Sequence, residues 1–233
     1  MLRPAASAGA LPATKTRTRS PPRSCPPPRG AASDDDDDEW RRRDALAALV
    51  SAAARRVGAA LEALVRDATA RDATARGVDE APRIPALLDE RRCPLCGEAD
   101  SATRFVWCDD RPRVVDAVEL ADFVLARLRM ATPDAVVAMT LVYTLVARRG
   151  PIVRAHSARP IFLAACVLAR KIGTDADIAT PECSAALDDE FTNLSALLLA
   201  RLEEQLLELL YWRIPLDPEV YAACARALGL DLG

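Results

Sequence analysis

The chain has 233 residues, a formal net charge of −3 and a pI near 5.4, which gives no general electrostatic case for binding nucleic acid or an anionic membrane. No apolar run reaches the roughly 20 residues that cross a bilayer, so we expect no membrane span. The seven cysteines are odd in number and several occupy apolar helical positions. Without a secretory signal they predict a reduced, intracellular protein, in the nucleus, the cytoplasm or both.

Residues 1–39 are rich in Pro, Ser, Ala and Arg and end in the acidic run Asp34 to Asp38. A segment of this composition cannot bury enough apolar surface to order itself, so we predict a disordered tail. The first 33 residues contain several arginines and no acid, which is also typical of an organelle transit peptide.

Residues 40–112 are predicted to form an N-terminal helix followed by a linker. Leucines and valines recur at helical spacing from Trp40 to Val65 and indicate an amphipathic helix. The five-residue repeat that follows, over residues 66–75, carries no apolar stripe. Residues 77–112 contain four prolines and are interpreted as the linker.

The linker contains the weak candidates for a metal site. Cys93 and Cys96 have the spacing of half a zinc site, and Cys108 is a possible third ligand. No fourth Cys or His lies nearby, so a pair of reduced thiols is the other interpretation, and we expect no metal and no cofactor. His156 is the single histidine, on a predicted loop, and no glycine-rich phosphate loop is present. We therefore predict no catalytic residues and a protein that is not an enzyme.

Residues 113–229 are predicted to form an all-α domain. Apolar spacing indicates helices over 116–130, 133–149, 158–172, 181–188, 192–212 and 218–228. Thr132, Thr180 and Asp217 each precede a proline and are predicted N-caps. The helix that is apolar all round, Ala135 to Val146, is predicted to be the centre of the domain.

Two charges of opposite sign interrupt apolar helical stripes. Lys171, one of only two lysines, shares a helix side with Val167 and Leu168. Glu203 falls among the leucines of the helix over 192–212. An unpaired charge is costly to bury, so the two charges suggest either an internal salt bridge or a shared docking surface.

These residues carry a resemblance to a known family. Leu168-Ala169-Arg170-Lys171-Ile172, followed by the sequence from Leu202 to Ile214, resembles the cyclin box, in which a lysine and a glutamate face a partner kinase. The subtype resembles the PHO-type and Y-type cyclins. Arg170 and Gly173-Thr174-Asp175 depart from the pattern of the family.

The resemblance implies a five-helix cyclin box with flanking helices. It also implies a regulatory subunit that binds and activates a cyclin-dependent protein kinase of the PCTAIRE or Pho85-like group. The residues implied to bind the kinase are Lys171, Glu203, Leu168, Ile172, Leu207, Trp212 and Ile214. Two alternatives stay open. One is a cyclin-fold transcription factor with a zinc-ribbon-like segment, and the other is a helical scaffold without a kinase partner.

Overall fold

The computed structural model describes residues 34–74, 83–93, 95, 114–173, 179–214 and 217–230. The chain divides into two units, Met1–Glu39 and Trp40–Gly233, and residues 1–33 of the predicted tail lie outside the described residues. In the described residues the elements are α1 (Asp34–Thr74), the 3-10 turn η1 (Ala86–Leu88), α2 (Val114–Arg127), α3 (Thr132–Arg149), α4 (Ala158–Gly173), α5 (Thr180–Leu187), α6 (Ala196–Leu209) and α7 (Pro218–Ala227). This part of the chain contains no strand, so the all-α prediction is confirmed.

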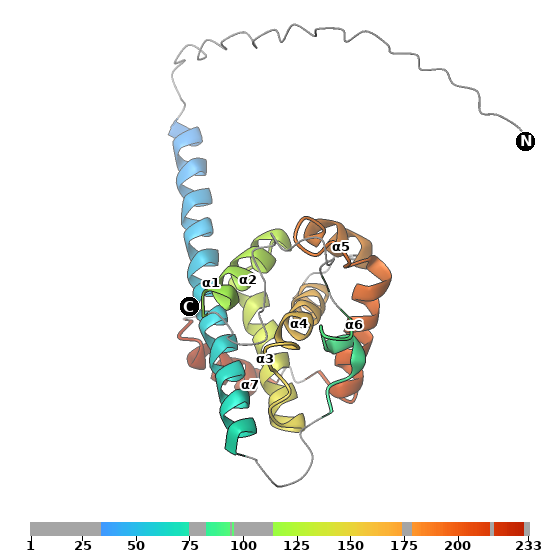
Figure 1. The fold of residues 1–233 in the computed structure, drawn as a ribbon. Coiled ribbons are helices and arrows are strands. Elements are labelled where there is room, and N and C mark those ends of the chain that lie inside the picture. Colours follow the sequence, from blue (N-terminus) through green and yellow to red (C-terminus); the bar gives the residue numbers. More distant parts are fainter. Residues whose placement is uncertain are drawn as a thin grey trace, which may run out of the picture. The chain divides into compact units, whose positions relative to one another are not determined.

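The helix α4 forms the centre of the second unit. Every residue from Ala158 to Ala169 is buried, and Figure 1 shows α4 surrounded by α2, α3, α5 and α6. The sequence-based choice of α3 as the centre is therefore wrong, because Val137, Tyr143 and Val146 of α3 keep part of their surface accessible. Charges confined to the ends of α4 leave its middle free to be enclosed on all sides.

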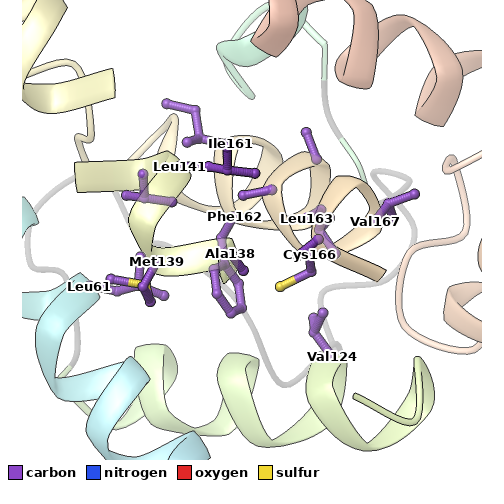
Figure 2. Packing of buried hydrophobic residues seen from close by; sticks show 14 of the residues in the cluster. Leu61, Val124, Ala138, Met139, Leu141, Ile161, Phe162, Leu163, Cys166 and Val167 are labelled. Atoms are coloured by element: carbon purple, nitrogen blue, oxygen red, sulfur yellow. The ribbon is translucent and has the colours of Figure 1, made fainter. Parts of the chain in front are cut away.

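Aliphatic side chains and a few aromatic ones fill the core. Figure 2 shows residues of α3 and α4, among them Met139 and Phe162, filling the space toward Leu61 of α1 and Val124 of α2. All four of these side chains are at most 1% exposed. The buried residues of the core are mainly Leu, Val and Ala on helices.

The helix α1 is longer than the sequence pattern indicated. It begins at Asp34, inside the predicted tail, and continues through the five-residue repeat to Thr74. Alanine favours helix strongly, and the ion pairs Arg66–Glu62 and Arg71–Asp67 add support at a spacing of four residues. Ala68 is fully buried, so the repeat also has one contact with the core.

A glycine sets the distance between α1 and α2. A Cβ atom placed on Gly58 would collide with the backbone of Val118, which lies in α2. Glycine normally weakens a helix interior by about 1 kcal/mol relative to alanine. Here its missing side chain permits the two backbones to approach.

The segment that was predicted to be a linker carries core contacts. Leu88 and Leu95 are fully buried, and the backbone N–H of Asn193 donates to the carbonyl of Leu95 at 3.0 Å. These contacts attach the described part of the segment to the helices of the second unit.

Candidate functional site

Lys171 and Glu203, the charges singled out in the sequence, lie in contact. Lys171 is in the last turn of α4 and Glu203 in the middle of α6. The ammonium Nζ of Lys171 lies 2.6 Å from Oε2 of Glu203. The internal salt bridge, one of the two interpretations of these charges, is therefore formed.

Thr180 completes this cluster. Lys171 donates to the hydroxyl oxygen of Thr180 at 2.7 Å, and that hydroxyl donates to Oε1 of Glu203 at 3.2 Å. Thr180 was predicted as an N-cap, but the N-cap of α5 is Ala179 and Thr180 is the first helical residue. Its side chain is thereby available to bridge α4 and α6. Sequence spacing gives no signal for this role, since Thr180 lies nine positions after Lys171 and in another helix.

The two partners of the ion pair differ in exposure. The side chain of Glu203 is 8% exposed and that of Lys171 is 30% exposed. Both oxygens of Glu203 already accept a hydrogen bond. An ammonium has three N–H donors, and the protein contacts given above use two of them. Lys171 therefore keeps donor capacity on the side that faces solvent.

The apolar residues predicted around this pair have unequal exposure. Ile172, next to Lys171, is 36% exposed, whereas Leu168 is only 6% exposed and belongs to the core. Leu207, one turn after Glu203 on α6, is half-buried. Leu168 therefore offers little accessible surface, while Ile172 and Leu207 offer more.

An aromatic turn follows α6. Tyr211 and Trp212 both adopt positive φ angles, 58° and 56°, which are uncommon for bulky residues. They are 60% and 63% exposed, and Ile214 is 37% exposed. The N–H of Trp212 donates to the carbonyl of Leu207 at 2.8 Å, so a hydrogen bond that closes the helix end maintains the strained backbone.

Two arginines of α3 hold this turn in place. Arg148 donates from its guanidinium to the carbonyl of Leu210 at 2.5 Å, and Arg149 donates to the carbonyl of Leu209 at 3.1 Å. The Arg149 guanidinium also lies 4.4 Å from the ring centroid of Tyr211. Cations are favourable at a helix C-terminus because they compensate its partial negative charge. Neither arginine was predicted as a site residue, and the only signal for them in the sequence is their place in the last turn of α3.

A second charged cluster lies at the other end of α4. Arg159 donates from Nε to Oε2 of Glu90 at 2.8 Å, and both side chains are 9% exposed. Burial is the main cause that raises the pKa of Glu90 above its usual value of 4.5. The neighbouring Asp89 accepts two hydrogen bonds from the Arg91 guanidinium, at 2.9 and 2.8 Å, and these bonds lower its pKa.

The metal candidates are only partly visible. Cys93 is half-buried and has a free thiol, whereas Cys96 and Cys108 lie outside the described residues. No group of three or more potential ligands converges in the part of the chain that the structure describes. His156 is half-buried, and its carbonyl accepts the N–H of Glu90 at 2.9 Å.

Three cysteines lie within the helices. Cys166, Cys183 and Cys224 are buried with free thiols, and burial is the main cause that raises the pKa of each. A raised pKa keeps the thiol protonated and unreactive. These cysteines therefore behave as core residues.

Comparisons with known proteins add no family assignment. Among the described helices, none is both long and apolar enough to cross a membrane. Searches against protein-family models, curated proteins and solved structures each find no match to this chain.

Proposed function

We propose that this chain is a cyclin-type regulatory subunit that binds and activates a cyclin-dependent protein kinase of the PCTAIRE or Pho85-like group. Within this proposal the chain performs no catalysis, binds no nucleic acid and acts in the nucleus or the cytoplasm. The observation that carries the proposal is Lys171, a charged residue that belongs to an ion pair and still has donor capacity beside the exposed Ile172.

The ion pair supports docking because it presents charge in a fixed position. Glu203 and Thr180 hold the Lys171 ammonium from two sides, so little side-chain entropy remains to be lost on binding. The remaining donor capacity of the ammonium suits a backbone carbonyl at the end of a partner helix. The pair would thus orient the kinase's regulatory helix.

The apolar part of the surface would extend along α6. The rise from Glu203 to Leu209 is about 9 Å, and the exposed side chains of Trp212 and Ile214 follow the end of this helix. A large aromatic ring at an interface is a frequent energetic hot spot. Charge at one end and an aromatic anchor at the other would define the direction in which a partner helix lies.

Activation would follow from binding alone. A protein kinase is active only when its regulatory helix and the paired lysine and glutamate are in place. A subunit that binds this arrangement more tightly than the inactive one shifts the equilibrium toward it. The chain then needs no reactive residue of its own.

The test measures binding and activity with a purified PCTAIRE-type kinase. Trp212→Ala removes the exposed ring and is expected to weaken binding by about 2 kcal/mol or more, about 30-fold. Leu197→Ala is the matched control, because Leu197 is 71% exposed and lies on the same side of α6 as Glu204, away from Glu203. Kinase binding that both variants retain in full would contradict the proposal.

A helical scaffold without a kinase partner is the second candidate. It is favoured by the ion pair itself, since Lys171 and Glu203 already satisfy each other. In a scaffold, the chain would neither bind the kinase nor raise its phosphorylation rate, although it would fold normally.

A further inference from the structure

A cavity of about 540 Å³ lies beside η1, and arginines dominate its lining. Among the described residues, it is lined by Arg83, Arg91, Arg92 and Arg154 and by one acid, Asp89. These lining residues carry four positive charges and one negative charge, and Asp72, outside the lining, pairs with Arg154. A concentration of guanidinium groups in one concave site favours an anionic ligand.

Two of these arginines are held by the protein before any ligand binds. Arg154 has a side chain that is only 17% exposed, and it donates to Asp72 at 3.0 Å and to the carbonyl of Pro151 at 3.3 Å. Arg91 is fixed by its two bonds to Asp89, a residue that is 2% exposed. Arg91 is therefore held by a buried carboxylate, and Arg154 by an exposed carboxylate and a partly buried carbonyl.

The other two arginines keep most of their donors. The guanidinium of Arg83 has no hydrogen bond or ion pair with any residue of the described segments. Arg92 approaches Asp89 only at 3.9 Å and its side chain is 66% exposed. Because each guanidinium carries five N–H donors, these two residues can supply the contacts that a ligand needs.

The wall that bears these arginines is anchored to the core. Leu88 is fully buried, Glu90 forms its ion pair with Arg159, and the Glu90 N–H donates to the His156 carbonyl. The segment that contributes Arg83, Arg91 and Arg92 to the cavity is therefore attached to the helices of the second unit.

We propose that this cavity binds a small molecule that carries a di- or triphosphate group on an uncharged body. One guanidinium can donate two parallel hydrogen bonds to the oxygens of a phosphoryl group. The four arginines therefore offer more N–H donors than one phosphoryl group requires. A volume of 540 Å³ lies within the range of small-molecule sites. Ile84, Pro85 and Ala86 also line the cavity and provide an apolar wall for the uncharged body, as a nucleoside diphosphate would need.

The site is separate from the kinase-docking surface. Arg159, which pairs with Glu90 beside the cavity-lining Asp89, lies twelve positions before Lys171 on α4, which corresponds to about 18 Å. The proposal therefore does not rest on the proposed kinase partner, and either can fail without the other.

The experiment is isothermal titration calorimetry on the full chain with ADP, inorganic pyrophosphate and adenosine as probes. ADP and pyrophosphate are expected to bind at one site, and adenosine is expected not to bind. The double variant Arg83→Ala/Arg92→Ala alters two exposed side chains, so the fold should be retained. It should weaken ADP binding by at least about tenfold.

Two control variants test whether ADP binding depends on the arginines of the cavity or on the positive charge of the chain in general. Arg226→Ala and Arg201→Ala each remove an exposed positive charge, from α7 and from α6. Both should bind ADP like the unmodified chain. The proposal is overturned if ADP does not bind at about 1 mM, if adenosine binds as well as ADP, or if the double variant binds like the unmodified chain. It is also overturned if a phosphoserine peptide binds more tightly than ADP and loses this affinity in the same variant.

Discussion

Replacing Lys171 with alanine should destabilise the protein because Glu203 would lose its charged partner. The Glu203 side chain is 8% exposed, and after the substitution it would keep only the Thr180 hydroxyl at 3.2 Å. Removing one member of a fully buried pair costs about 3–5 kcal/mol. Lys171 is 30% exposed, so water can reach the vacated position, and we expect about 2–3 kcal/mol.

The assay is urea unfolding followed by far-UV circular dichroism. In thermal unfolding, the expected loss of about 2–3 kcal/mol in the free energy of unfolding corresponds to a decrease of about 4–12 °C in melting temperature for a unit of this size. The double variant Lys171→Met/Glu203→Leu removes both charges and keeps apolar volume, so its stability should lie close to that of the unmodified chain. A cycle of Lys171→Met, Glu203→Leu and this double variant then gives the coupling energy of the pair.

A change of less than about 0.5 kcal/mol in the free energy of unfolding of Lys171→Ala, the range of ordinary surface substitutions, would show that the ion pair does not stabilise the fold. The double variant also tests docking, since it should fold but lack the charges that would orient a kinase. If it binds the kinase as tightly as the unmodified chain, the pair has a structural role only.

Further predictions concern α1, the buried acid Asp89 and the metal candidates. Gly58→Ala should lower the free energy of unfolding in denaturant titrations, although alanine favours helix, because the added Cβ meets the Val118 backbone; a stabilised variant would contradict the close approach of α1 and α2. Asp89→Asn should cost about 1.5–3 kcal/mol near neutral pH through weaker bonds to Arg91. Because folding lowers the Asp89 pKa from 3.8, this contribution is present above that value and is lost as pH falls through the lower folded-state pKa, so stability curves of the two proteins should converge in acid. We expect elemental analysis of purified protein to find no tightly held zinc at Cys93, and one zinc per chain with unfolding on chelation would support the transcription-factor alternative.

The bounds of α2 to α7 could be predicted from the sequence to within a few residues, whereas α1 extends well beyond its predicted bounds at both ends. The predicted span 158–172 lacks only the last residue of α4, and Asp217 caps α7 by accepting the N–H of Glu219 at 2.8 Å. The N-caps of α3 and α5 are Ala131 and Ala179, each one residue before the predicted threonine. Apolar spacing and capping residues act over three or four positions, so they can be read locally. The same local pattern identified Lys171 and Glu203 as charges that need an explanation.

Tertiary structure alone decided which partners these charged residues have. Thr180 joins the ion pair from another helix, and Arg148 reaches a carbonyl 62 positions away. Glu90 pairs with Arg159 across 69 positions, which attaches a segment that its prolines made look like a linker. Such contacts depend on which helix faces meet after packing, and the spacing within one helix carries no information about them. The centre of the unit was misplaced for the same reason, because enclosure of α4 depends on its neighbours and not on its own hydrophobicity.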